Sequence, residues 1–218
     1  MAAATTGNSI ASPIRIAVIV STTRKPRACP QIAKFTLDTI STLSPSTAAK
    51  PYELHTLDLL DHPLPFHDEP AVPSQIDDPA KYVHEHTRAW CAVISSFDAF
   101  VFVTPQYNWG YPAVLKNAID YLYNEWKGKP AMVVSYGGHG GGKSNAQLRE
   151  VLGGVRMDVV EKGVELAFAG RQGTVIASQG RDMGLDGKSG EGLWSDKRGE
   201  ISEAFEQMLG KCGKSGGK

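Results

Sequence analysis

The sequence lacks an excess of charge of either sign, and it lacks a long hydrophobic run. Its 218 residues include 23 basic and 23 acidic side chains, so the formal net charge is zero. A nucleic-acid-binding protein generally needs a basic surface that neutralises phosphates, so that class is not expected. No apolar run approaches the roughly 20 residues that cross a bilayer, so membrane insertion is not expected. The apolar fraction of 41% is ordinary, which disfavours disorder.

Cysteine is scarce as well. Cys29, Cys91 and Cys212 are odd in number and widely spaced, without a CxxC pair or a glycosylation sequon. This usage predicts a reducing compartment, most simply the cytoplasm. Arg24 and Arg27 stand shortly before Cys29 in the sequence and favour a lowered pKa for its thiol. Because no paired base or second thiol stands nearby, no reactive role is assigned to Cys29.

The two ends of the chain carry no signal of a folded element. Residues 1–13 have neither the basic nor the apolar part of a secretory signal, and residues 211–218 are rich in Gly and Lys. Both segments are predicted to be flexible tails. They flank one predicted domain over residues 14–210, a length at which a single hydrophobic core suffices.

Strand-like and helical patterns alternate along the chain. Strands are predicted over residues 14–20, 52–57, 99–104 and 131–135, with further strand-like segments over 159–168 and 174–177. Helices are predicted over residues 32–43, 83–97, 114–126, 148–155 and 201–209, and a proline-rich loop over 61–79. This alternation is typical of a parallel α/β sheet with helices on both faces. Five units match the flavodoxin-like order 2-1-3-4-5, in which ligands bind at the carboxyl ends of strands one, three and four.

The loop after the first strand combines hydroxyl groups with positive charge. It reads Ser21-Thr22-Thr23-Arg24-Lys25-Pro26-Arg27 and leads into a helix. Backbone N–H groups at a helix N-terminus bind anions, and guanidinium groups suit a phosphate. The loop therefore predicts a phosphate site, with a solvated basic turn as the alternative.

The loop after the third strand is aromatic. It reads Pro105-Gln106-Tyr107-Asn108-Trp109-Gly110-Tyr111-Pro112. Flat aromatic faces and amide groups are suited to a planar heterocycle, and a glycine allows the backbone to approach it closely. The alternative is that the aromatic side chains cap the sheet or contact another subunit.

The loop after the fourth strand is rich in glycine. Residues 137–144 read GGHGGGKS and match the phosphate-loop pattern GxxxxGK[ST], so a nucleotide triphosphatase is a competing hypothesis. Two features disfavour it, because the motif does not open the fold and no apolar strand ends in an Asp that could bind magnesium. The preferred interpretation is a surface of backbone N–H groups that approaches the edge of a ring.

The remaining groups of histidine and acidic residues give only weak indications of a metal or catalytic site. His84 and His86 stand two residues apart on a predicted helix and would face different ways, so they are not expected to bind a metal together. His62 and His67 lie in the proline-rich loop and are expected to be exposed. No serine, histidine and aspartate order and no paired carboxylates appear, so no catalytic side chain is named and no metal is expected.

With these loops in view, the chain resembles the NADPH-dependent FMN reductase family of flavodoxin-like proteins, and most of all its yeast-type FMN and quinone reductases. The similarity covers about residues 15–168 and is densest over 101–141, VFVTPQYNWGYPAVLKNAIDYLYNEWKGKPAMVVSYGGHGG. The resemblance implies that the phosphate loop of FMN consists of Thr22, Thr23, Arg24 and Arg27. It implies that the flavin ring and ribityl chain are lined by Pro105, Gln106, Tyr107, Asn108 and Trp109, with Asn108 bonded to the cofactor. It implies that the pyrimidine end of the ring meets backbone groups of Ser135, Tyr136, Gly137 and Gly138.

Two positions depart from the family pattern. Ser21 stands where the family usually has Gly, and Gln106 where it often has Glu. Neither departure removes a group that phosphate or ring binding would need. After Phe168 the resemblance fades, and residues 169–195 carry no expected role.

The resemblance implies an FMN-containing oxidoreductase that takes hydride from NADPH or NADH and passes electrons to a quinone, a flavin or a similar small acceptor. Family likeness also suggests a homodimer or homotetramer. A second hypothesis keeps FMN but treats the protein as an electron carrier or redox sensor. Such carriers are usually strongly acidic, and the zero net charge disfavours that hypothesis.

Overall fold

The computed structural model describes residues 12–43, 51–185 and 192–213. Most of the two predicted tails, residues 1–11 and 214–218, lies outside the described residues. At the C-terminal end, the Lys211 ammonium forms an ion pair of 2.6 Å with Asp158. Contacts with the body of the protein therefore extend at least to Lys211.

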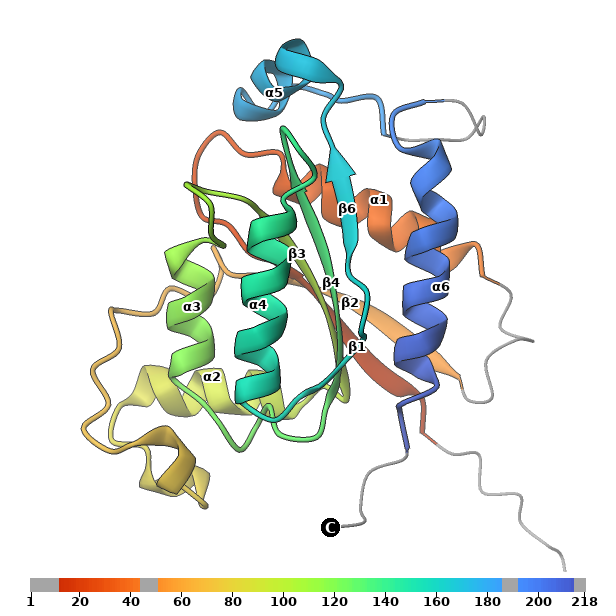
Figure 1. Ribbon diagram of the computed structural model, residues 1–218. Helices are drawn as coiled ribbons and strands as arrows, with labels where there is room; N and C mark the ends of the chain where they lie inside the picture. The colour runs from red at the N-terminus through yellow and green to blue at the C-terminus, as the bar shows by residue number, and fades with distance from the viewer. Residues whose placement is uncertain (1–11, 44–50, 186–191, 214–218) are drawn as a thin grey trace, which may run out of the picture.

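A parallel sheet forms the centre of the molecule (Figure 1). Its strands are β1 (Ile14–Val20), β2 (Tyr52–Asp58), β3 (Ala99–Pro105), β4 (Pro130–Gly137), β5 (Asp158–Val159) and β6 (Val164–Ala167). They lie in the order β2-β1-β3-β4-β5, as the flavodoxin-like prediction requires. The fifth position is divided, because β5 and β6 both pair with β4. The side chain of Asn145 occupies the space beside Gly163, where an added Cβ would lie 2.1 Å from its Oδ1 atom.

Helices cover both faces of the sheet. They are α1 (Cys29–Ser41), α2 (Glu85–Ser95), α3 (Ala113–Asp120), α4 (Gly142–Gly154), α5 (Gly170–Ser178) and α6 (Arg198–Leu209). Alternate residues of a strand point to opposite faces, and β1 shows this clearly. Ile16 and Val18 join the core beneath α1 and α6, whereas Ala17 and Ile19 join the core beneath α2, α3 and α4. Each face of the sheet thus has its own hydrophobic core.

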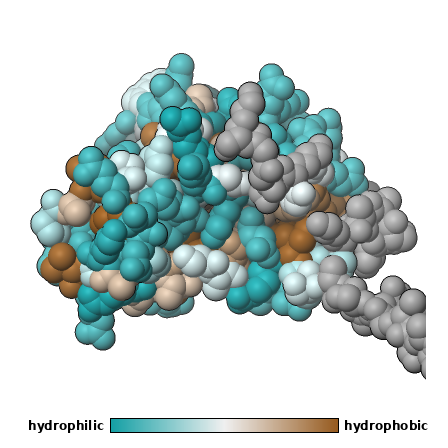
Figure 2. Space-filling view, turned by 90° about the horizontal axis from the view of Figure 1, so that it is seen from below, coloured by the Kyte–Doolittle hydropathy of each residue, from teal (hydrophilic) through white to brown (hydrophobic). Residues whose placement is uncertain are grey.

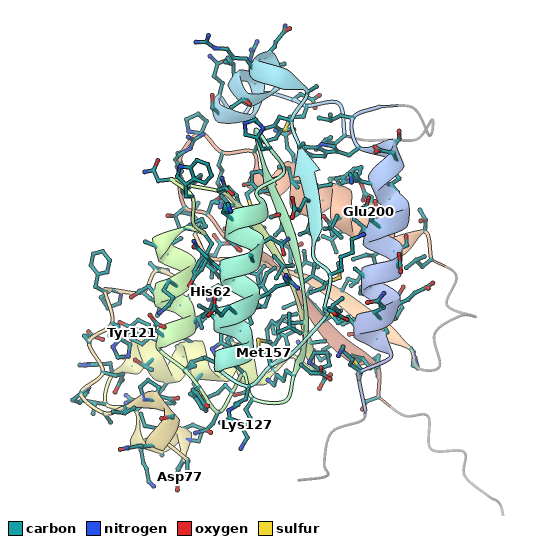
Figure 3. All side chains as sticks on the ribbon, viewed as in Figure 1. His62, Asp77, Tyr121, Lys127, Met157 and Glu200 are labelled. Carbon is teal, nitrogen blue, oxygen red and sulfur yellow. The ribbon has the colours of Figure 1, made fainter. Side chains whose placement is uncertain are left out.

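Helix α3 is shorter than the predicted 114–126, since it ends at Asp120. Two indole groups account for this end. Trp90 Nε1 donates to the Ala118 carbonyl at 2.8 Å, and Trp126 Nε1 donates to the Ile119 carbonyl at 3.2 Å. These bonds satisfy carbonyl groups that a helix end leaves open. Tyr121 follows directly, beside the lower end of α3 in Figure 3.

The strand-like segment predicted over residues 174–177 is wrong, because it lies within helix α5. Its Thr, Val and Ile residues favour strands, yet none of the described strands pairs with it to complete a ladder. Its backbone groups are satisfied within the helix instead. The side chain of Thr174 also donates to the Gly170 carbonyl at 3.2 Å. Tertiary position therefore overrides local preference here.

The described residues include no helix that is long and apolar enough to cross a membrane. Figure 2 views the end of the molecule opposite the carboxyl ends of the strands. Hydrophilic residues dominate this face, and hydrophobic residues are scattered among them. The three loops that follow β1, β3 and β4 lie at the other end of the molecule.

Candidate functional site

A cavity of about 210 Å³ lies at the carboxyl ends of the strands, where the three predicted loops meet. From those loops it is lined by Arg24, Arg27, Ala28, Pro105, Gln106, Tyr107, Tyr136, Gly137 and Gly138. We call these residues the strand-end wall. The opposite side is formed by Phe168, Thr174, Ala177 and Ser178, which we call the α5 wall. The structure thus brings together most of the residues that the sequence predicted to be a site.

Two buried hydroxyl groups lie at the first loop. Ser21 and Thr22 are 0% and 1% exposed, and neither Oγ atom has a hydrogen-bond partner in the described structure. Helix α1 begins just beyond, and its first turn receives no bond from a capping side chain. Unpaired buried hydroxyls are uncommon, and a helix N-terminus attracts anions. Neither Ser21 nor Thr22 lines the cavity, and the partly exposed Thr23 does not line it either.

The two arginines of the first loop have different partners. Arg27 forms a bidentate ion pair with Asp58 at 2.8 and 2.6 Å and also donates to the Thr22 carbonyl, and its bond to Asp58 raises its pKa. Arg24 donates to the Pro26 carbonyl at 3.1 Å and to the Ser178 carbonyl at 2.7 Å. Arg27 therefore braces the loop, while Arg24 joins the strand-end wall to α5.

The second loop is a tight hairpin. Tyr107 and Gly110 exchange backbone hydrogen bonds of 2.8 and 3.0 Å, with Asn108 and Trp109 between them. These two residues have φ values of 45° and 72°, as a two-residue hairpin turn of type I′ requires. Trp109 is 69% exposed. Asn108 and Trp109 thus form the tip of the hairpin and do not line the cavity.

The third loop contributes backbone to the cavity wall. Tyr136, Gly137 and Gly138 line the cavity, but Ser135 lies behind them. The buried Ser135 hydroxyl donates to the Gly140 carbonyl at 2.9 Å, which holds the glycine turn in place. Gly141 has a φ of +80°, and an added Cβ there would lie 2.9 Å from the Tyr136 carbonyl oxygen. The close turn therefore requires a glycine.

The competing phosphate-loop hypothesis does not agree with this geometry. The backbone N–H groups of Lys143 and Ser144 point to Gln106 Oε1, at 3.0 and 3.4 Å. The Ser144 hydroxyl, which would bind magnesium, is buried and donates to the Pro105 carbonyl at 2.9 Å. The Glu165 carboxylate lies against Gly142, where a negative charge would repel phosphates.

Sequence reasoning missed the α5 wall. An added Cβ on Gly138 would lie 3.7 Å from the Thr174 hydroxyl, so the two walls face each other closely. Beyond α5, Gln31 Nε2 donates to the Arg181 carbonyl at 3.0 Å, and its Oε1 accepts from the Met183 N–H at 3.1 Å. No motif marks this segment. Its one distinctive feature in the sequence is a group of seven glycines between Gly170 and Gly192.

The prediction that the pKa of the Cys29 thiol is lowered is wrong. The thiol is fully buried, and its Sγ lies 3.3 Å from the Val103 carbonyl oxygen. Burial raises the pKa of Cys29 to about 11. Burial likewise raises the pKa of Tyr136. Neither group is ionised at neutral pH.

The predicted separation of the two histidines is wrong as well. Helix α2 begins at Glu85, so His84 is an extended residue in front of the helix rather than part of it. The rings of His84 and His86 consequently stack, with centroids 5.0 Å apart and planes 8° apart. His62, predicted to be exposed, is half-buried, with its ring centroid 5.5 Å from that of Trp90. His67 is exposed as predicted.

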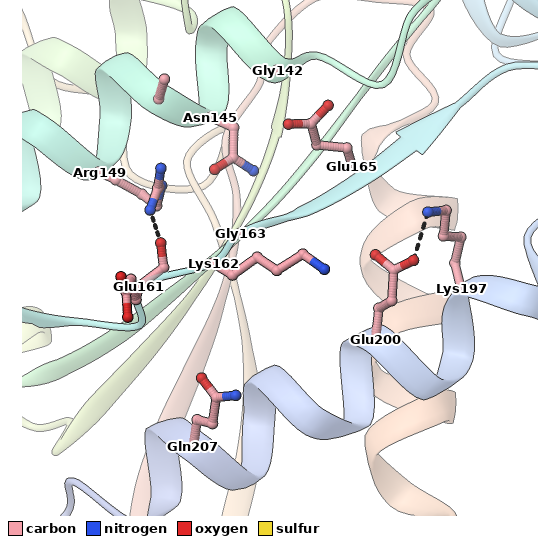
Figure 4. A pocket seen from close by; sticks show the side chains of 11 residues that line it. Gly142, Asn145, Arg149, Glu161, Lys162, Gly163, Glu165, Lys197, Glu200 and Gln207 are labelled. Carbon is pink, nitrogen blue, oxygen red and sulfur yellow. Dashed lines mark hydrogen bonds and ion pairs between the residues drawn. The ribbon is translucent and has the colours of Figure 1, made fainter.

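A second and larger hollow of about 670 Å³ lies between α4, the β5–β6 connection and α6 (Figure 4). Side chains of both charge signs line it, and Lys197 and Glu200 already form an ion pair of 2.7 Å. None of the predicted site residues lines it. The smaller strand-end cavity is therefore the stronger candidate, because three chemically distinctive loops converge there.

The chain is similar to known proteins over most of its length. The model of the NADPH-dependent FMN reductase family matches residues 14–170, a range that includes all three loops. The chain is 46% identical over 149 residues to the NAD(P)H-dependent FMN reductase LOT6 of Saccharomyces cerevisiae, covering 67% of this chain and 78% of that one. It is 31% identical over 173 residues to a quinone reductase of Pseudomonas putida, covering 76% and 83%.

Among solved structures, the fold resembles that of FerB, a flavoenzyme NAD(P)H:(acceptor) oxidoreductase from Paracoccus denitrificans. The TM-score is 0.59 at 25% sequence identity, and the match covers 91% of this chain and 98% of that one. The likeness therefore extends over nearly the whole described fold.

Proposed function

The chain belongs to the NADPH-dependent FMN reductase family, and we propose that it oxidises NADPH or NADH with FMN held in the strand-end cavity. The electrons then pass to a quinone, a free flavin or a similar small acceptor. One observation carries the location of the site. Residues of all three loops inside the family match line a single cavity, and the unpaired Ser21 and Thr22 hydroxyls belong to the first of these loops.

The first loop fits the phosphate end of FMN. The Ser21 and Thr22 hydroxyls are buried without partners, and each can donate a hydrogen bond to a phosphate oxygen. The N-terminus of α1, which no side chain caps, adds a positive electrostatic potential that favours an anion. Arg24 supplies the charge, since Arg27 is already paired with Asp58. We assign Thr23 to the same loop through its backbone.

The second and third loops fit the ring end. Gln106 and Tyr107 offer an amide and an aromatic face, while Gly137 and Gly138 present backbone without side chains. We propose that Asn108 and Trp109, which directly follow Tyr107, contact the flavin or the substrate from the hairpin tip. Ser135 acts through its bond to the glycine turn.

When bound, FMN supplies the hydride and electron transfer, so the protein needs no nucleophile of its own. Desolvation raises the pKa values of the two tyrosines that line the cavity, the buried Tyr136 and the more exposed Tyr107. They remain protonated at neutral pH and can only donate or accept hydrogen bonds. The chain's own contribution is to bind and orient the ligand and to shield it from water with the α5 wall.

The proposal is tested by reconstituting the purified chain with FMN under anaerobic conditions. We expect NADPH to bleach the flavin absorbance and a quinone to restore it over many turnovers. A chain that binds FMN but is not reduced by NADPH would instead be an electron carrier. A chain that binds no flavin and hydrolyses ATP would favour the phosphate-loop hypothesis.

We also propose that residues 14–210 form one domain, that it acts in the cytoplasm, and that two copies associate through the 107–110 hairpin. The exposed Trp109 and Tyr107 support this contact, because large exposed aromatics often mark interfaces. Sedimentation of the native chain and of Trp109→Ser tests it. A dimer that persists unchanged in Trp109→Ser would place the contact elsewhere.

A further inference from the structure

Three possible metal ligands converge at the start of α2, far from the strand-end cavity. They are Asp68 from the long loop, His84 before the helix and His86 in its first turn, and one donor atom of each lies within 4.8 Å of the others. Asp68 Oδ1 is 3.0 Å from His86 Nε2 and 3.9 Å from His84 Nε2. Figure 3 shows Tyr121, which contacts this cluster, near the lower end of α3 and far from α5.

These distances suit a small coordination sphere. Zinc binds nitrogen and oxygen ligands at about 2.0–2.1 Å, which puts tetrahedral ligand atoms about 3.4 Å apart. The two distances from Asp68 Oδ1 lie on either side of that value, and the donor atoms of His84 and His86 lie within 4.8 Å of each other, so the imidazole rings would turn inwards to close the site. Two imidazoles and one carboxylate favour zinc and similar transition metals, whereas calcium and magnesium prefer oxygen ligands alone.

The surrounding residues hold the three ligands in place. Glu69, which is 7% exposed, accepts hydrogen bonds from the backbone N–H groups of Val83 at 3.1 Å and His84 at 3.0 Å. Tyr121 donates to Asp68 Oδ1 at 2.9 Å. Such outer contacts orient metal ligands in known sites.

Helix α3 fixes the loop further. Asn117 donates to the Pro65 carbonyl at 2.7 Å and accepts from the His67 N–H at 2.9 Å. The segment 65–69 is therefore tied to both α2 and α3 before any ion arrives. A site whose backbone is already ordered loses little entropy on binding.

The cluster is open to solvent. The side chains of Asp68, His84 and His86 are 40%, 36% and 30% exposed. An ion can reach them directly, and water can complete its coordination. A network of hydrogen bonds alone would also explain one imidazole beside Asp68. Here both imidazoles turn Nε2 towards Asp68: that of His86 lies 3.0 Å from Oδ1, and that of His84 lies 3.2 Å from the main-chain carbonyl oxygen and 3.9 Å from Oδ1.

We propose that Asp68, His84 and His86 bind a zinc-class divalent cation, with Tyr121 and Glu69 as positioning residues. The ion links the 65–69 segment to the start of α2. It shares no residue with the strand-end cavity. Its role is to brace the fold, and its binding is independent of flavin chemistry.

The test is a zinc titration of the full-length chain, loaded with FMN, stripped of metals with a chelator and desalted. A chromophoric zinc indicator competes for the added zinc chloride. We expect one tight site per chain in the native sequence. His86→Gln and Asp68→Asn should each lose it, and Tyr121→Phe should bind about ten-fold more weakly because Asp68 is less well oriented.

His62→Gln is the matched control, because it removes an imidazole from the same long loop without touching the cluster. It should bind zinc as the native chain does. Near-ultraviolet circular dichroism of the metal-free variants checks that each has folded. The proposal fails if the native chain does not compete with the indicator, or if the folded His86→Gln and Asp68→Asn variants bind zinc as tightly as it does.

Discussion

The two walls of the cavity are held in place by different means. The strand-end wall follows directly from β1, β3 and β4, and its glycine turn fits so closely that an added Cβ on Gly141 would lie 2.9 Å from backbone. In the α5 wall, Phe168 and Ala177 belong to the hydrophobic core, and the Ser178 carbonyl accepts a hydrogen bond from Arg24. Gly170 at its start has a φ of +61° but no neighbour within 4 Å of an added Cβ. The strand-end wall is held by the close turn of its own backbone, whereas the α5 wall is held by side-chain packing and by the bond from Arg24.

The largest expected effect tests the rigidity of the strand-end wall. Gly141→Ala combines a left-handed φ with an overlap against the Tyr136 backbone, so the free energy of unfolding should fall by about 3 kcal/mol. FMN binding should be lost with it. Gly170→Ala, which carries the strained φ alone, should lose only about 1 kcal/mol. Urea unfolding measures both, and equal losses would mean that the two walls do not differ.

The next effect concerns the ion pair beneath the phosphate loop. Arg27→Ala leaves the partly buried Asp58 carboxylate without its partner, so the free energy of unfolding should fall by about 2 kcal/mol. The double variant Arg27→Ala/Asp58→Ala should recover part of that loss, since no unpaired charge remains. If the double variant is less stable than Arg27→Ala, the pair does not act as described.

Arg24→Ala should affect the ligand rather than the fold. Arg24 is exposed, and its removal should leave the unfolding midpoint nearly unchanged. FMN should bind at least about ten-fold more weakly, because a charge-assisted bond to phosphate is lost. Amide exchange over residues 170–178 should also quicken, because the bond to the Ser178 carbonyl is gone.

Lys25→Ala is the control for this prediction, since it removes a neighbouring exposed cation that does not line the cavity. It should bind FMN as the native chain does. Unchanged FMN affinity in Arg24→Ala would reject its assignment to the phosphate.

The smallest effect at neutral pH comes from Cys29. Burial raises its pKa from 9.0 to about 11, so the folded protein holds this proton more tightly than the unfolded chain. The resulting stability is complete below pH 9.0 and is lost as the pH rises towards about 11. Stability of Cys29→Ala should therefore decline less steeply over that range in urea unfolding at stepped pH. An identical slope would show that Cys29 does not titrate there.

The contrast between the strand-end wall and the α5 wall also explains which parts of the site could be predicted from the sequence. The strand-end loops follow buried strands with strong hydrophobic patterns, so their position at one edge of the sheet follows from topology. The α5 wall follows no such pattern. Its β-branched residues Thr174, Val175 and Ile176 favour a strand, yet the segment forms helix α5, and none of the described strands pairs with it.

Two other errors have the same origin in tertiary contacts. Helix α3 ends where the indoles of Trp90 and Trp126 reach its carbonyl groups, and those contacts come from distant or later residues. His84 leaves helix α2 because Glu69 binds its backbone N–H. A local pattern cannot reveal a partner 15 residues away in the chain. The flavin chemistry was predicted from family resemblance, because neither the composition nor the spacing of the motifs indicates it.

The most direct test of the central claim compares FMN with riboflavin, which lacks the phosphate. Fluorescence titrations of the native chain and of Thr22→Val would give the affinity for each flavin. The strand-end cavity predicts that the native chain prefers FMN and that Thr22→Val loses much of this preference while binding riboflavin as before. Equal affinity of the native chain for the two flavins would contradict a phosphate site at the first loop.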